Sequence, residues 1–156
     1  MTSTDSEPVV RQSRIRAPAE TLFTFFTDPE KMLLWMGVEA QLDPRPGGLC
    51  RVNVTGRDIL RAEYTEIVPN EKIVFSWGWE APGHPLPPGS STVEITFTQQ
   101  GELTIVRVAH HGLPRAEQLN QAYGWQHYLG RLGMAAIGRD SGPDPWVVPE
   151  EQRKSL

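Results

Sequence analysis

The stretch His110–Ala136, HHGLPRAEQLNQAYGWQHYLGRLGMAA, determines the fold that we expect for this chain. It begins as the end of a strand, turns at Gly112-Leu113-Pro114, and continues as the longest helix that the sequence predicts. The apolar side chains of this helix repeat at helical spacing, so it is amphipathic and has to cover an apolar surface. Its apolar stripe consists of Ala122, Trp125, Leu129, Leu132 and Ala136, with Tyr128 and Gly133 at the margins.

The segment before this helix predicts such a surface. From Ala40 to His111, apolar and polar residues alternate in short runs that are separated by turn residues. Runs of this kind form antiparallel strands with one apolar and one solvated face. The predicted strands are 50–54, 59–68, 73–79, 92–99 and 103–111, and the strongest alternation places Ile73, Phe75, Trp77 and Trp79 on one face.

The N-terminal part predicts a strand over residues 9–16 and then two short helices. Pro18 suits the first position of a helix, and Asp28-Pro29 provides a cap and a first residue for the second. The apolar faces of these helices consist of Leu22, Phe23 and Phe26 in the first and Met32, Trp35 and Met36 in the second.

We expect one domain over residues 8–137, a disordered tail over 1–7 and an irregular tail over 138–156. Between Trp79 and Ser90 the run EAPGHPLPPG contains four prolines, which predicts a mobile connection and a candidate lid. Fifteen basic against nineteen acidic residues give a net charge of −4 without a basic run, which argues against a nucleic acid partner.

Other classes of protein are excluded by simple features of the sequence. No apolar run approaches the roughly 18 residues of a membrane span. The N-terminus, MTSTDSEPVV, lacks the layout of a secretory signal, and the single Cys50 excludes an internal disulfide. We therefore expect a cytoplasmic protein.

Together these elements predict an α+β fold in which a curved antiparallel sheet of about six to seven strands wraps around the long C-terminal helix. Such a sheet, closed by a helix, can keep an internal hydrophobic cavity where the facing side chains do not fill it.

Several short signatures occur in the same order as the expected elements. They are Ala17-Pro18-Ala19-Glu20 with Phe23, Thr27-Asp28-Pro29-Glu30 with Trp35, Arg45-Pro46-Gly47-Gly48, the run YTEIVPNEKIVFSW over 64–77, His110-x-Gly112-Leu113-Pro114, and Gly124-Trp125. On these residues, over about 8 to 136, the chain resembles the SRPBCC superfamily of START and birch-pollen-allergen-like helix-grip proteins. Within that superfamily it is most similar to the homologues of the activator of the ninety-kilodalton heat-shock-protein ATPase.

The resemblance implies a β-α-α-β6-α order, with the last helix gripped by the sheet and a hydrophobic cavity between them. It leaves the activity open, because such proteins include lipid or polyketide binders, cyclases, aromatases, co-chaperone domains and self-resistance proteins. It also implies that Trp35 lies at the cavity entrance, although Trp35 would equally well fasten its helix to the sheet.

Aromatic side chains on the inner face are candidates for lining the cavity, since aromatic faces bury much area and stack on planar ligands. The alternative is that they form a dry, filled core. The candidate ligand contacts are Trp35, Val52, Tyr64, Phe75, Trp77, Trp79, Phe97, Val108, His110, Trp125, Tyr128 and Leu129.

His110 is the candidate for acid–base chemistry, because it shares the inward phase of its strand with Val106 and Val108. The alternative is a core histidine that is satisfied by a backbone group. We expect no metal and no cofactor, since the histidines and Cys50 show no ligand spacing and no phosphate-binding loop or nucleophile elbow occurs.

Three functions agree with these observations. The first is non-catalytic binding of a small hydrophobic or aromatic ligand, such as a lipid, polyketide or flavonoid. The second is a polyketide cyclase or aromatase that uses His110 as acid or base, and the third is a co-chaperone-like interaction module. A homodimer would explain the apolar Trp146-Val147-Val148 in the tail, but docking of the tail on its own subunit would explain it equally well.

Overall fold

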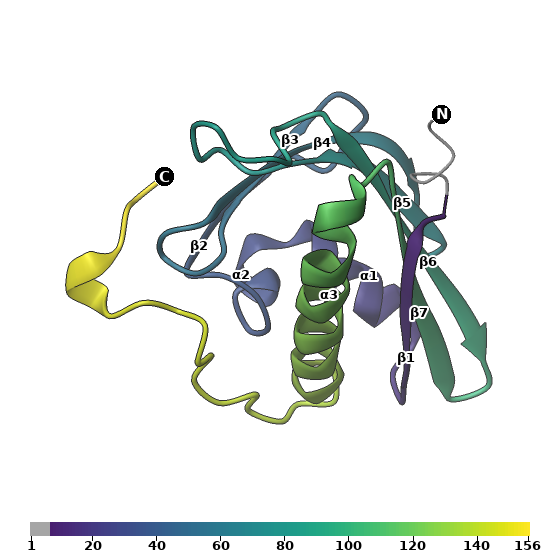
Figure 1. The fold of residues 1–156 in the computed structure, drawn as a ribbon. Helices are drawn as coiled ribbons and strands as arrows, with labels where there is room; N and C mark the ends of the chain where they lie inside the picture. The colour runs from purple at the N-terminus through teal and green to yellow at the C-terminus, as the bar shows by residue number, and fades with distance from the viewer. Residues whose placement is uncertain (1–6) are drawn as a thin grey trace.

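The computed structural model describes residues 7–156 and has seven strands and three α-helices (Figure 1). The predicted disorder of residues 1–6 lies outside the described range. The strands are β1 (Val9–Ile15), β2 (Glu39–Leu42), β3 (Leu49–Asn53), β4 (Ile59–Val68), β5 (Lys72–Trp77), β6 (Ser91–Gln100) and β7 (Leu103–His111). The helices are α1 (Ala19–Thr27), α2 (Pro29–Met32) and α3 (Arg115–Ala135), and a 3-10 turn, η2 (Glu150–Gln152), lies in the C-terminal tail.

The strands form one antiparallel sheet in the order β1-β7-β6-β5-β4-β3-β2. The sheet curves around α3, while α1 and α2 lie at the far side of that helix in the view of Figure 1. The predicted α+β fold, with a curved antiparallel sheet wrapped on a long C-terminal helix, is thereby confirmed.

α2 begins where the sequence predicts, whereas α1 begins one residue later than predicted, with Pro18 as its N-cap. α2 is also shorter than predicted, since it ends at Met32, and Trp35 and Met36 lie in the irregular segment that follows. α1 follows Pro18, and the Asp28 carboxylate accepts a hydrogen bond from the Glu30 backbone N–H at 2.9 Å at the start of α2. Pro29 occupies the first helical position, where its missing N–H costs no hydrogen bond. The apolar face of α1 differs in one respect, because Phe25 is buried whereas Phe23 is only partly buried.

Strand β5 ends at Trp77, two residues earlier than predicted. The reason is Gly78, where any β-carbon would collide with the backbone carbonyl of Pro87. The chain therefore runs against the Pro-rich connection at this point, and Trp79 keeps only an isolated bridge to Leu60.

The Pro-rich connection that was predicted to be mobile is anchored by Leu86, whose side chain is fully buried. Its backbone carbonyl accepts a hydrogen bond from the Trp79 N–H at 2.8 Å, and its own N–H donates to Nδ1 of His84 at 2.9 Å. The buried leucine and the bond to Trp79 fasten the connection to the rest of the fold, and the bond to His84 lies within the connection.

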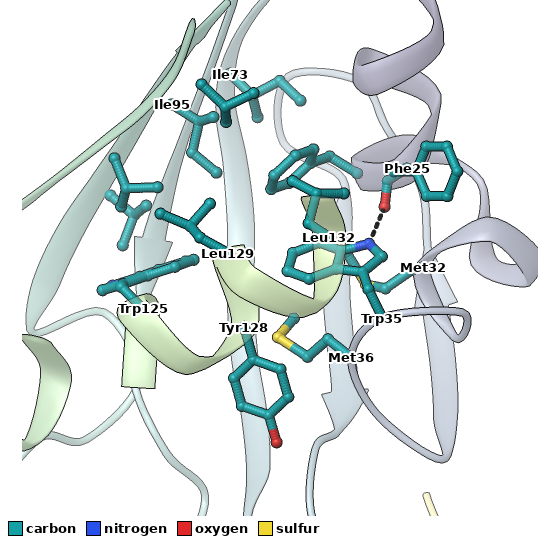
Figure 2. Packing of buried hydrophobic residues seen from close by; sticks show 14 of the residues in the cluster. Phe25, Met32, Trp35, Met36, Ile73, Ile95, Trp125, Tyr128, Leu129 and Leu132 are labelled. Carbon is teal, nitrogen blue, oxygen red and sulfur yellow. Dashed lines mark hydrogen bonds between the residues drawn. The ribbon is translucent and has the colours of Figure 1, made fainter. Parts of the chain in front are cut away.

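Aromatic rings fill the centre of the fold (Figure 2). Trp35 packs on Phe26 with ring centroids 5.0 Å apart and donates its indole N–H to the Phe25 carbonyl at 3.0 Å. Tyr64 stacks on Phe75 at 5.3 Å. The helix α3 completes this core with Ala122, Trp125, Tyr128, Leu129, Leu132 and Ala135.

Leu86→Ala is expected to lower the free energy of unfolding by about 2–5 kcal/mol, because it leaves a cavity at a fully buried site. The matched control is Leu119→Ala on α3, whose side chain is 62% exposed and for which we expect a change within about 0.5 kcal/mol. Urea unfolding of both variants measures the difference. Equal effects would mean that the connection is not anchored by Leu86.

Candidate functional site

A pocket of about 270 Å³ lies beside the first half of α3. It is bounded by that helix, by the end of β5, by the turn between β3 and β4, and by the C-terminal tail. Its lining consists of Met36, Val54, Thr55, Asp58, Trp77, Trp79, His84, Glu117, Asn120, Gln121, Gly124, Trp125, Tyr128 and Trp146.

Four of the five tryptophans of the chain line this one pocket. Trp77 and Trp125 form one wall, with ring centroids 5.0 Å apart and planes inclined by 40°. Trp79 continues that wall beyond the end of β5, and Trp146 reaches the pocket from the tail. Converging aromatic rings of this kind offer a large apolar contact area to a planar ligand.

Part of the polar lining comes from a second stripe of α3, and the rest consists of Thr55, Asp58 and His84. The members of this second stripe recur at helical spacing and lie beside the apolar stripe that fills the core. They are Glu117, Asn120, Gln121, Gly124 and Tyr128. α3 therefore contributes two faces to the structure, because its apolar stripe closes the core and its second stripe lines the pocket.

Gly124 keeps this part of the pocket open. A β-carbon placed there would meet no atom within 4 Å, and the same holds for Gly130 farther along the helix. A close approach of the helix to the sheet therefore does not account for glycine at either position.

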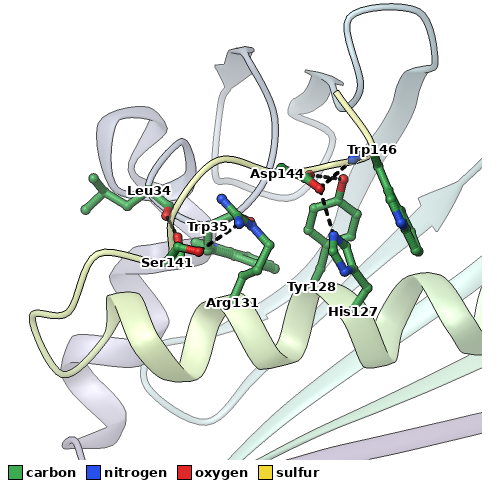
Figure 3. Close-up of polar contacts among 8 residues, drawn as sticks. All are labelled: Leu34, Trp35, His127, Tyr128, Arg131, Ser141, Asp144 and Trp146. Carbon is green, nitrogen blue, oxygen red and sulfur yellow. Dashed lines mark hydrogen bonds and ion pairs between the residues drawn. The ribbon is translucent and has the colours of Figure 1, made fainter. Parts of the chain in front are cut away.

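The C-terminal tail runs along α3 (Figure 3) and contributes Trp146 to the pocket lining. Trp146 stacks on His127 with ring centroids 3.9 Å apart and planes inclined by 16°. Asp144 joins the cluster, since its carboxylate accepts a hydrogen bond from the Tyr128 hydroxyl at 2.6 Å and lies 2.8 Å from Nε2 of His127.

The protonation of this cluster follows from its contacts. Burial alone would raise the pKa of Asp144, but hydrogen bonds from Tyr128, the Trp146 backbone N–H and His127 outweigh it and lower that pKa. Burial, together with the hydrogen bond to Asp144, raises the pKa of Tyr128. Asp144 is therefore a carboxylate and Tyr128 a neutral phenol at neutral pH.

Backbone hydrogen bonds fix the rest of the tail to its own chain. Val148 N–H donates to the Thr55 carbonyl at 2.8 Å, and Lys154 N–H donates to the Gly56 carbonyl at 2.6 Å. Nearer to α3, Arg131 donates to the carbonyls of Trp35 and Ser141 (Figure 3). Of the two explanations for the apolar residues of the tail, the structure shows docking on the same subunit.

The predicted ligand contacts separate into two groups. Trp77, Trp79, Trp125 and Tyr128 line the pocket, although binding by them stays a prediction. The others are buried in the core and lie outside this pocket, although Trp35 and Phe75 border a small internal cavity of about 10 Å³. They are Trp35, Val52, Tyr64, Phe75, Phe97, Val108, His110 and Leu129.

His110 is fully buried and both of its ring nitrogens have partners. The Trp125 indole N–H, which can only donate, bonds to Nδ1 at 3.1 Å. Nε2 therefore carries the proton and donates to the Ser91 hydroxyl at 2.9 Å, and Ser91 donates in turn to the Trp77 carbonyl.

Burial lowers the pKa of His110 to about 3, and the neighbouring His111 contributes in the same direction. The imidazole is consequently neutral at physiological pH and links β7, β6 and α3. This geometry is that of a satisfied core histidine, the alternative to an acid–base role.

Sequence reasoning missed most of the polar lining. Glu117, Asn120, Gln121 and Gly124 carried a signal, because they share a helical face with Tyr128. The remaining contacts come from a turn, a loop and the tail, whose positions no periodicity specifies. They are Val54, Thr55, Asp58, His84 and Trp146, together with Met36 from the irregular segment after α2.

Two further searches concern residues 7–156 only. No group of three or more His, Cys, Asp or Glu side chains in that range is arranged to hold a metal ion. In the same range no helix has both the length and the apolar character to cross a membrane.

Comparison with known proteins gives one family match. The family model described as activator of Hsp90 ATPase homolog 1-like protein matches residues 16–136. An uncharacterised protein of Schizosaccharomyces pombe is 34% identical over 108 residues, which are 65% of this chain and 29% of that protein. The human activator of 90 kDa heat shock protein ATPase homolog 1 is 27% identical over 124 residues, 76% of this chain and 33% of its own length. The chain thus spans about a third of the length of these relatives.

Solved structures show the same fold. An AHSA1-like protein from Rhizobium etli is 48% identical with a TM-score of 0.71, and the match covers 92% of this chain and 89% of that one. DynU16, a protein of the dynemicin biosynthetic locus, is 25% identical with a TM-score of 0.76 over 89% of this chain and 51% of its own. CalU16 from Micromonospora echinospora is 26% identical with a TM-score of 0.69, and the match covers 87% of this chain and 76% of that one.

The lowered pKa of His110 predicts how stability depends on pH. Between the ordinary value of 6.5 and about 3, the unfolded chain binds a proton at this position and the folded chain does not. The free energy of unfolding therefore falls as the pH drops through this window, by about 2 kcal/mol from His110 alone at about pH 5.

Urea unfolding at about pH 7 and about pH 5 tests this expectation. His110→Gln should lose less stability on acidification than the wild type, whatever its stability at neutral pH. His111→Gln, an exposed neighbour, should keep most of the wild-type pH dependence, because burial is the larger cause of the lowered pKa of His110. Identical losses in the wild type and in His110→Gln would show that His110 is not held neutral by the fold.

Proposed function

The chain belongs to the activator of Hsp90 ATPase homolog 1-like family, and from this premise we propose that it binds a small, largely aromatic ligand in the pocket between α3, the end of β5 and the tail. Binding, rather than catalysis, is the function that the geometry supports best. The observation that carries the proposal is the convergence of Trp77, Trp79, Trp125 and Trp146 on one open space.

The pocket, rather than the centre of the fold, is the binding site in this proposal. Central aromatic residues already contact one another, as Tyr64 does with Phe75, and their polar atoms are satisfied within the protein. The pocket volume of about 270 Å³ lies close to the lower end of the range of small-molecule sites, roughly 300–1,000 Å³. A ligand of one to three rings suits this volume.

Two further observations support a small-molecule role. DynU16, which shares the fold, comes from the dynemicin biosynthetic locus. The lining also combines apolar rings with a few polar groups from α3, which is the usual composition of a small-molecule site.

A cyclase or aromatase that uses His110 has less support. An acid–base catalyst must reach the ligand through a hydrogen bond or a single water. Both ring nitrogens of His110 are occupied by Trp125 and Ser91, and the residue lies outside the pocket lining. For the co-chaperone alternative, the match to the human activator covers 33% of that protein, so its activity is not transferred to this chain.

Gly124→Leu tests the binding proposal, because it places a side chain in the open part of the pocket. We expect it to weaken the binding of 1-aminoanthracene, a neutral fluorescent probe, by at least about tenfold, since the probe and the leucine would compete for the same volume. Titration with the purified protein, followed by probe fluorescence, measures the effect.

Gly130→Leu is the matched control. It replaces another α3 glycine with no atom near its β-carbon position, and it lies outside the pocket. We expect it to bind 1-aminoanthracene as the wild type does. Binding that is equally strong in Gly124→Leu would contradict the proposed site, and no binding to the wild type would contradict the proposed function for this class of ligand.

A further inference from the structure

The charges of the pocket lining all have one sign. Asp58 and Glu117 are acidic, and the lining contains neither lysine nor arginine. His84 accepts a hydrogen bond at Nδ1 from the Leu86 N–H. The open space therefore lies in a negative field, to which Asp144 behind Tyr128 adds.

Glu117 is the central member of this set, because it is only 8% exposed. Within residues 7–156 its carboxylate has neither a hydrogen-bond partner nor an ion pair. The carboxylate oxygens are not among the fully buried side-chain atoms that lack a partner, so they reach the open space of the pocket, where a bound cation can pair with them. The first turn of α3 also favours a negative charge at this position through the helix dipole.

The tryptophans supply the other part of a cation site. Indole faces attract cations more strongly than other aromatic rings do, and the attraction grows when the site excludes water. Trp77, Trp79, Trp125 and Trp146 line the same space as Glu117. An aromatic wall with an adjoining carboxylate is the arrangement that recognises organic ammonium groups.

The indole N–H groups of Trp77 and Trp79 have no acceptor in the described part of the chain, which could favour a ligand acceptor instead. Solvent does not reach either nitrogen, so neither N–H is presented to the open space. The carboxylates therefore determine the preferred sign of the ligand charge.

We propose that the ligand of this pocket is an organic cation, an alkylammonium compound that carries an aromatic group, whose positive group pairs with Glu117 and whose aromatic part packs on the tryptophans. This inference rests on the proposed binding function and narrows it to one chemical class. Asp58 assists from the rim, where one of its carboxylate oxygens accepts a hydrogen bond from the Thr55 hydroxyl at 2.7 Å.

Three probes of similar size and different charge test the inference. Tryptamine is a cation at neutral pH, 3-propylindole is neutral, and indole-3-propionate is an anion. Each is titrated against the complex of the protein with 1-aminoanthracene, and displacement is read from the fluorescence of that probe. We expect tryptamine to displace it at a concentration about tenfold lower than 3-propylindole does, with indole-3-propionate the weakest.

Glu117→Gln is expected to abolish the difference between tryptamine and 3-propylindole. The matched control is Glu20→Gln, which removes a carboxylate from the first turn of α1, where it is exposed and far from the pocket lining. That variant should keep the preference for tryptamine.

The possible outcomes separate the two proposals. Equal displacement by tryptamine and 3-propylindole, or stronger displacement by indole-3-propionate, overturns the cation inference but leaves ligand binding in place. A preference for tryptamine that survives in Glu117→Gln overturns the assignment of Glu117. If 1-aminoanthracene and all three indoles fail to bind the wild type, the binding function itself fails.

Discussion

The contact between Trp125 of α3 and the concave face of the sheet is the interaction on which the rest of the structure depends. Its ring packs on Trp77 of β5, and its indole N–H donates to His110 of β7. His110 continues the connection to Ser91 of β6. One side chain thus fixes the helix against three neighbouring strands, and it also determines which helical face borders the core and which borders the pocket.

The division between core and pocket follows from that constraint. A helix gripped by a curved sheet cannot contact the sheet equally along its whole length, because the two surfaces curve differently. Toward the C-terminal half of α3, Leu129 and Leu132 meet the aromatic core and leave no comparable space. Toward the N-terminal half, Gly124 and the polar side chains of the second stripe face an opening that the tail covers only in part.

Much of the fold could be predicted from the sequence, because apolar residues repeat with the period of a strand or of a helix along most of the chain. The alternation of two along β5 and the helical spacing around Trp125 identify the two surfaces that must meet. The site was less predictable for a physical reason. Inward-facing residues such as Val108 and Phe97 have the same alternation as Trp77, and only the curvature of the sheet decides that their surroundings are filled.

The tail illustrates a second limit of sequence reasoning. Trp146 reaches the pocket because Val148 and Lys154 form hydrogen bonds with the turn between β3 and β4. These partners are about 90 residues apart in the chain, and local sequence patterns do not predict contacts over such a separation. The family match ends at residue 136, so this tryptophan lies outside the part of the chain that the family model covers. A part of the pocket that the family model does not include is a place where ligand preference can differ among relatives.

The location of the ligand is the central claim, and the five indole N–H signals of a ¹⁵N-labelled sample report on it most directly. During titration with 1-aminoanthracene, the account predicts that the signals of Trp77, Trp79, Trp125 and Trp146 shift together, because their rings line the pocket. The signal of Trp35, whose N–H is bonded to the Phe25 carbonyl inside the core, should stay unchanged. A shift of Trp35 without the other four would place the ligand in the centre of the fold and contradict the account.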